Sequence, residues 1–162
     1  MTPPSAGLPA PLLLARQLAP LLEGLEWAIG GSSLLWRLGL EPAPRDLDIV
    51  VSLECAGAAE TILDGCLQRL PRPAHADYAS EVFVRYRASS GVELDLMAGI
   101  AARREGALVR WEFDPAKSCR QDALPFMPAE DWLDLYRLFD RPRRVEQLTR
   151  YLATRAQGSL MM

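Results

Sequence analysis

The segment Asp46–Val51 constrains the fold most, because acidic and apolar residues alternate along it in the order Asp-Leu-Asp-Ile-Val-Val. Residues i and i+2 of a strand project from the same face. Asp46 and Asp48 therefore share one face of a predicted strand, whereas Leu47 and Ile49 face a hydrophobic core. Two carboxylates about 4 Å apart repel by roughly 4 kcal/mol at an effective dielectric near 20. Such a pair is either well solvated or holds a cation.

The remaining sequence predicts helices alternating with strands, followed by two further helices. This order is typical of an α+β domain with a mixed sheet flanked by helices and a C-terminal helical pair. Pro20 should bend or end the first helix, and Ser32 or Ser33 should cap the second. The expected helices span residues 12–22, 32–38 and 58–70 and two segments after Pro128 and Pro142, and the expected strands span residues 26–29, 46–51, 82–87, 92–97 and 107–113.

The chain divides into three predicted parts. Residues 1–11 contain four prolines and are expected to form a flexible N-terminal arm. Residues 12–127 form the core, and residues 128–158 form a C-terminal helical module. In that module, Trp132 and Tyr136 belong to an apolar stripe with helical spacing.

Composition narrows the class of protein. With 49% hydrophobic and 24% charged residues among 162, the chain is neither disordered nor collagen-like nor a coiled coil. Its net charge of −3 argues against a protein coated by nucleic acid. The sequence contains no run of about 18 apolar residues, as a membrane helix needs, and its three cysteines form no C-x-x-C pair. We expect a cytoplasmic protein with reduced thiols.

A third acid and a glycine-rich turn complete the candidate site. Asp95 projects opposite to the core-facing residues of its own predicted strand. If that strand lies beside Asp46–Val51, three carboxylates meet and can bind one Mg²⁺ and share a second, and Asp95 can also accept a proton from a hydroxyl. Gly30 and Gly31 allow a phosphate to approach the backbone. Ser32 begins a short helix, whose free N–H groups favour an anion.

Two arginines flank these motifs. Arg37 and Arg45 are candidates to reach triphosphate oxygens, because a guanidinium matches phosphate geometry. Arg45 is the better candidate, since it directly precedes Asp46.

The order Gly-Gly-Ser, then Asp-Leu-Asp, then a lone Asp in a later strand resembles the DNA polymerase β-like nucleotidyltransferase superfamily. It is similar above all to small stand-alone bacterial members, including the AbiEii-type nucleotidyltransferases of abortive-infection and toxin–antitoxin systems. The resemblance implies a nucleotidyltransferase fold and a Mg²⁺-dependent transfer of a nucleoside monophosphate from an NTP to a hydroxyl, with release of pyrophosphate. It implies that Gly31 and Ser32 hold the phosphates and that Asp46, Asp48 and Asp95 hold the metal.

The C-terminal segment Pro128–Arg144 also resembles the helical segment of these proteins, with two departures. Tyr136 stands where the family usually has a lysine, and Arg144 stands where it usually has an aspartate. The alternative is therefore a catalytically degenerate protein with this fold that acts as a binding partner, for example in a toxin–antitoxin pair. The sequence leaves the acceptor open among a small molecule, a tRNA and a protein.

Overall fold

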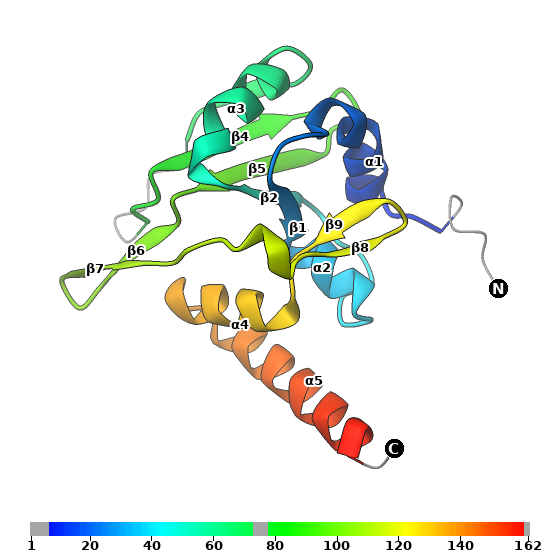
Figure 1. Cartoon of the computed structure of the whole chain (residues 1–162), viewed down its shortest axis with the longest axis vertical. Coiled ribbons are helices and arrows are strands. Elements are labelled where there is room, and N and C mark those ends of the chain that lie inside the picture. The colour runs from blue at the N-terminus through cyan, green and yellow to red at the C-terminus, as the bar shows by residue number, and fades with distance from the viewer. Residues whose placement is uncertain (1–6, 73–77, 161–162) are drawn as a thin grey trace.

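The computed structural model describes residues 7–72 and 78–160 and shows a seven-stranded mixed sheet with helices around it (Figure 1). The strand order is β3-β4-β5-β2-β1-β9-β8, and β6 and β7 form a separate two-stranded sheet. The helices are α1 (Ala10–Leu22), α2 (Gly31–Arg37), α3 (Ala56–Asp64), α4 (Ala129–Leu138) and α5 (Pro142–Leu160). The strands are β1 (Trp27–Gly30), β2 (Leu47–Val51), β3 (Gln68–Leu70), β4 (Val82–Arg87), β5 (Glu93–Ala98), β6 (Ala101–Arg104), β7 (Ala107–Arg110), β8 (Cys119–Gln121) and β9 (Leu124–Phe126).

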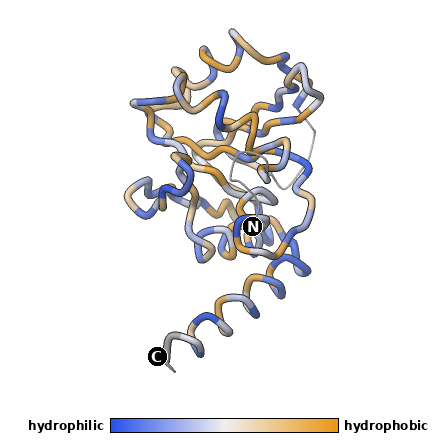
Figure 2. Tube along the Cα trace, turned by 90° about the vertical axis from the view of Figure 1, so that its right-hand side faces the viewer, coloured by the Kyte–Doolittle hydropathy of each residue, from blue (hydrophilic) through white to orange (hydrophobic). Residues whose placement is uncertain are grey.

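The predicted α+β architecture is confirmed. Strand β2 lies in the middle of the sheet, where it pairs parallel with β5 and antiparallel with β1. The expected hairpin of β4 and β5 is present as an antiparallel pair. Leu47, Ile49 and Leu94 are fully buried, as the alternation along their strands predicts. Figure 2 shows that hydrophobic residues concentrate in the body of the molecule.

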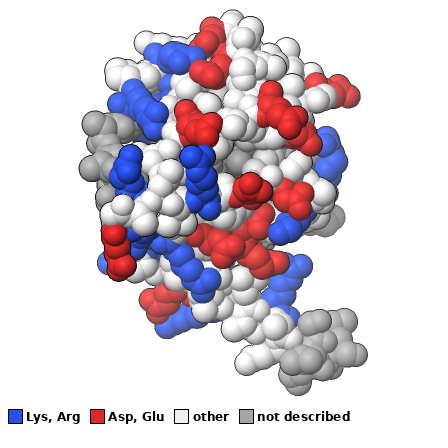
Figure 3. Space-filling view, turned by 60° about the vertical axis from the view of Figure 1, so that its left-hand side comes forward, with Lys and Arg blue, Asp and Glu red and all other residues white. Residues whose placement is uncertain are grey.

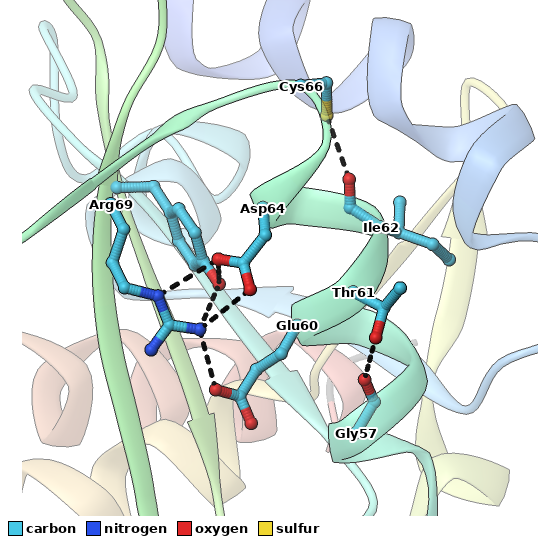
Figure 4. A network of polar contacts seen from close by, with 8 residues as sticks. Gly57, Glu60, Thr61, Ile62, Asp64, Cys66 and Arg69 are labelled. Atoms are coloured by element: carbon cyan, nitrogen blue, oxygen red, sulfur yellow. Dashed lines mark hydrogen bonds and ion pairs between the residues drawn. The ribbon is translucent and has the colours of Figure 1, made fainter.

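The predicted helix over residues 58–70 is wrong at its C-terminal end. Helix α3 ends at Asp64, and Gln68–Leu70 instead forms an edge strand that pairs with β4. Arg69 of this strand reaches back to α3 and forms ion pairs with Glu60 and Asp64 (Figure 4). Backbone pairing and these ion pairs favour the strand. Both join residues that are distant in the sequence, so a helical periodicity does not reveal them.

Two further details of the N-terminal region concern α1. Helix α1 begins at Ala10, so its first two residues lie inside the expected arm, and Leu8 is buried against the core. Residues 1–6 lie outside the described part of the chain. Of the two effects expected of Pro20, a bend or an end, the structure excludes the end, because α1 continues to Leu22. A proline inside a helix removes one backbone hydrogen bond and crowds the carbonyl four residues earlier, and the buried apolar face of α1 offsets that cost.

The strand expected over residues 107–113 is shorter and lies elsewhere than in the main sheet. It ends at Arg110, and it pairs with β6 in a hairpin whose second strand is exposed along its whole length. Figure 1 shows this hairpin extending from the body.

The C-terminal helical pair is confirmed. Trp132 and Tyr136 of α4 are buried, as is Leu148 of α5. Helix α5 continues away from the body, and its last turns project beyond the rest of the molecule (Figures 1 and 2). No helix within residues 7–72 and 78–160 is both long and apolar enough to cross a membrane.

Candidate active site

The sheet brings two of the three predicted acids side by side. Asp48 of β2 pairs in register with Asp95 of β5, so both side chains project from the same face. Gly30 of β1 pairs with Asp48 on one side, and Arg85 of β4 pairs with Asp95 on the other. The result is a row of four paired positions across four strands, with Asp46 just before β2.

Three residues of this row, Asp48, Asp95 and Arg85, line a pocket of about 400 Å³. Of the residues singled out in the sequence, Asp46, Asp48, Asp95, Ser32 and Arg45 line it, whereas Gly30 and Gly31 do not. The remaining lining residues are Glu41, Ala43, Tyr78, Phe83, Arg85, Met97, Trp132, Tyr136, Phe139, Arg141 and Arg144.

Each of the two glycines makes room for a side chain of the pocket. A Cβ atom at Gly31 would lie 1.8 Å from Oδ2 of Asp48, and the backbone there has a φ of +61°. A Cβ atom at Gly30 would lie 1.8 Å from Nε1 of the Trp132 indole. The close approach that we expected of a phosphate is thus made by a carboxylate and an aromatic ring.

Neither serine caps α2 as predicted. The N-cap is Gly30, and no side chain bonds to the free N–H groups there. The hydroxyls of Ser32 and Ser33 instead donate to the backbone carbonyl of Asp46, at 3.4 and 3.2 Å. Both serines therefore tie the start of α2 to the residue that precedes β2, which holds the turn beside the carboxylates.

The electrostatics of the pocket favour a protonated or cation-bound carboxylate. Burial, followed by the charges of Asp95 and Asp46, raises the pKa of Asp48 to about 7. Burial, followed by the charge of Asp95, also raises the pKa of Asp46. Within the described residues, neither carboxylate has a hydrogen bond or an ion pair of its own. Perturbed acids that converge in a pocket are typical of functional sites.

Asp95 has a different environment from the other two acids. Arg85 grips both of its oxygens, with Nε 2.7 Å from Oδ1 and Nη2 3.1 Å from Oδ2. The contact raises the pKa of Arg85. Arg85 therefore balances the charge of Asp95.

The donors present fit a magnesium ion in part. Among the residues that the structure describes, no three acidic, histidine or cysteine side chains lie close enough together to form a ready metal site. Asp46 and Asp48 nevertheless offer carboxylate oxygens to the same pocket. Because Mg²⁺ keeps several waters and is commonly bound through one or two carboxylates, these two residues fit it in chemistry and number.

An aromatic and basic wall from α4 and the residues after it faces the carboxylates. Trp132 and Tyr136 of α4 stack edge to face at 5.3 Å. Burial, followed by the charge of Asp48, raises the pKa of Tyr136. Arg141 donates to the hydroxyl of Tyr78 at 3.1 Å, and Arg144 forms an ion pair of 3.0 Å with Glu41. The helical stripe predicted that α4 is buried, and its residues Trp132 and Tyr136 line the pocket.

Arg37, the second arginine proposed to reach a triphosphate, lies away from the pocket. Its guanidinium bonds to Asp122 at 2.7 Å and to Gln121, and it lies over the ring of Phe126. The side chain of Arg37 is therefore held against β8, β9 and the turn between them, outside the pocket.

Charges of both signs are interspersed over the surface shown in Figure 3, where acidic side chains adjoin one another near the middle of the face with basic ones beside them. A second, more open concavity of about 930 Å³ follows α5 and shares Arg144 with the pocket. We place the candidate active site in the smaller pocket, because the perturbed carboxylates lie there.

Comparisons with known proteins agree with this picture at the level of the fold. No protein-family model and no curated protein matches the chain. Among solved structures, the crystal structure of a "putative nucleotidyltransferase" from Thermotoga maritima matches with a TM-score of 0.65 and 22% sequence identity, over 94% of this chain and 99% of that one. The chain therefore has a nucleotidyltransferase-like fold.

Proposed function

We propose that this protein is a nucleotidyltransferase that moves a nucleoside monophosphate from an NTP to a hydroxyl acceptor and releases pyrophosphate. The observation that carries the proposal is the pair of unpartnered carboxylates, Asp46 and Asp48, in a pocket that Arg45, Arg141 and Arg144 also line. Carboxylates for a metal ion and guanidinium groups for phosphate are the two needs of phosphoryl-group transfer. The name of the Thermotoga maritima neighbour agrees with this reaction class.

Asp46 and Asp48 would hold Mg²⁺, which when bound offsets the charge of the phosphates. The acceptor oxygen forms a bond to the α-phosphorus, and the bond from that phosphorus to the bridging oxygen of pyrophosphate breaks. The bridging oxygen keeps the electron pair. The proton of the acceptor hydroxyl would pass to Asp95. An ionised carboxylate has about four acceptor positions, and Arg85 occupies two of them, so two remain for the proton.

The turn at the start of α2 and the arginine before β2 would contact the leaving phosphates. Ser32 lines the pocket beside Asp46, and Arg45 is exposed at the rim, free of the ion pairs found elsewhere in the described chain. Tyr136 fills the place of the family's lysine, so positive charge on that side comes from Arg141 and Arg144 instead. The acceptor remains a small molecule, a tRNA or a protein.

The test is transfer of label from α-labelled NTPs to a small hydroxylated compound, to total tRNA or to cell lysate. Wild-type protein should label one of these in the presence of Mg²⁺, and Asp46→Asn combined with Asp48→Asn should abolish labelling. Asp134→Asn is the matched control, because Asp134 is an exposed acid of α4 outside the pocket. Titration calorimetry with Mg·NTP gives the binding step separately.

Failure of millimolar NTP to bind would contradict the proposal. Binding that survives loss of both acids would also contradict it. Nucleotide binding that needs these acids but yields no labelled product would point instead to the degenerate binding protein.

A further inference from the structure

We propose that Arg85 acts as a fixed cation of the site, so that the chain takes one divalent ion on Asp46 and Asp48 rather than two ions shared by three carboxylates. The inference rests on the proposed function, which places a divalent ion in this pocket. It assigns Arg85 as a positioning residue, since it acts through Asp95.

The contact between Arg85 and Asp95 is built into the sheet. The two residues are paired across β4 and β5, so the backbone register holds their Cβ atoms opposite each other. Their side chains meet in the two-bond geometry that a planar guanidinium and a carboxylate favour. The side chain of Asp95 is only 13% exposed and that of Arg85 32%. This is a partly buried pair, which solvent screens less than a surface pair.

The charges of the site also count in favour of one ion. Three carboxylates carry a formal charge of −3, and Arg85 cancels one of them. The remaining two belong to Asp46 and Asp48, which have no ion pair within the described residues and are the carboxylates left to hold a divalent cation. A second divalent cation bound to Asp95 would lie beside the guanidinium, where like charges repel.

The three acids are therefore not equivalent. Asp46 and Asp48 have no ion pair or hydrogen bond to their carboxylates within the described residues, whereas both oxygens of Asp95 are engaged.

The experiment counts bound Mn²⁺ with the full chain, by electron paramagnetic resonance of the free ion, without nucleotide. Wild-type protein should bind one Mn²⁺. Asp46→Asn and Asp48→Asn should each weaken binding by tenfold or more, whereas the double variant Arg85→Gln with Asp95→Asn, which removes both partners of the ion pair, should change it less than about threefold. Arg85→Gln should tighten binding by about tenfold or admit a second ion, because it uncovers a third carboxylate. Arg85→Lys, which keeps the charge, should bind one ion as wild type does.

Arg87→Gln is the matched control. Arg87 lies two residues along the same strand and is paired with Glu93 in register, at 3.8 Å, but it does not line the pocket. Its substitution should leave Mn²⁺ binding unchanged. If Arg85→Gln does not fold, the double variant with Asp95→Asn, which leaves neither charge unpaired, should bind one Mn²⁺ within about threefold of wild type.

Two outcomes overturn the proposal: two Mn²⁺ ions in the wild-type protein, or an Arg85→Gln variant that behaves like Arg87→Gln. Loss of tenfold or more in the double variant has the same meaning. None of these readouts needs an NTP. A protein that shows the expected Mn²⁺ pattern but never uses an NTP would refute the proposed transferase and leave the role of Arg85 in place.

Discussion

Two clusters in this molecule are made from the same kinds of side chain but differ in their balance of charge. At α3, Arg69 bonds to Glu60 at 2.9 Å and to Asp64 at 3.0 Å, and Tyr86 donates to Asp64 at 3.0 Å (Figure 4). In the pocket, Asp95 pairs with Arg85 and Glu41 pairs with Arg144, but within the described residues Asp46 and Asp48 have no such partner and the buried Tyr136 donates to no acid. The first cluster is satisfied internally, whereas the second is not.

The acids respond in opposite directions. Hydrogen bonding to Arg69 lowers the pKa of Asp64, so its charged form is favoured in the folded protein. Burial and two neighbouring acids raise the pKa of Asp48 to about 7, so its charged form costs stability. A fold that keeps such an acid uncompensated indicates a site that awaits a ligand.

The largest expected effect comes from removing the charge at each cluster in turn. Asp48→Asn should lower the rate of nucleotide transfer by about a thousandfold, or about 4 kcal/mol, without lowering the melting temperature. Asp64→Asn should lower the melting temperature and leave the rate within about threefold. Transfer assays and thermal melts on both variants check the contrast. If Asp48→Asn destabilises the fold as Asp64→Asn does, the two clusters do not differ in the way described.

The dependence of stability on pH separates the clusters next. Because the pKa of Asp48 is raised in the folded protein, its contribution to the free energy of unfolding is fully present below the unfolded pKa of about 3.9. This contribution is lost as the pH rises through the folded value. Asp48→Asn should therefore gain on wild type between about pH 4 and pH 7, by on the order of 2–4 kcal/mol, and then level off. The measurement is urea unfolding in EDTA, which removes any bound cation.

Asp64 should show the reverse dependence in the same experiment. Its folded pKa is lowered, so its stabilisation is present above about pH 4 and is lost as the pH falls through the folded value. A difference between wild type and Asp64→Asn that grows with falling pH would be the wrong sign.

A pair of glycines tests the packing of the same two regions. Gly31→Ala should cost about 2 kcal/mol or more in the free energy of unfolding, because its positive φ disfavours a side chain and a Cβ would strike Asp48. Gly57→Ala, in α3, should stabilise by about 0.4–1 kcal/mol, since no atom lies within 4 Å of its Cβ position. Chemical denaturation of both variants measures the difference. Equal effects would mean that Gly31 is an ordinary turn residue.

The smallest expected effect concerns the tyrosine that completes the α3 cluster. Tyr86→Phe removes the hydrogen bond to Asp64 and should cost about 1 kcal/mol, while the buried ring stays in place. Tyr151→Phe is the control, because the Tyr151 hydroxyl only accepts a 3.4 Å bond from Arg155 at the surface, and it should cost less than about 0.5 kcal/mol. Urea denaturation resolves the two values.

Alternation along the chain carried much of the information about this fold. It predicted the strand after Asp46, the hairpin that carries Asp95 and the buried stripe of α4, because these depend on local periodicity and burial. The condition that the two acidic strands lie side by side is met by the register of Asp48 with Asp95.

Contacts between distant segments explain what periodicity missed. The pairing of Gln68–Leu70 with β4 overrides a helical pattern, and the aromatic wall depends on where Trp132 packs, over Gly30. The engagement of Asp95 by Arg85 likewise follows from strand register, which a single sequence does not specify.

The hairpin of β4 and β5 has a consequence for how the chain assembles. Arg85 and Asp95 are close in the sequence and belong to the same hairpin. Asp48 comes from β2, which α3 and β3 separate from that hairpin along the chain. If the hairpin forms before it pairs with β2, Asp95 is already neutralised by Arg85 at that stage. The later, long-range pairing then brings Asp48 beside an ion pair rather than beside a bare carboxylate.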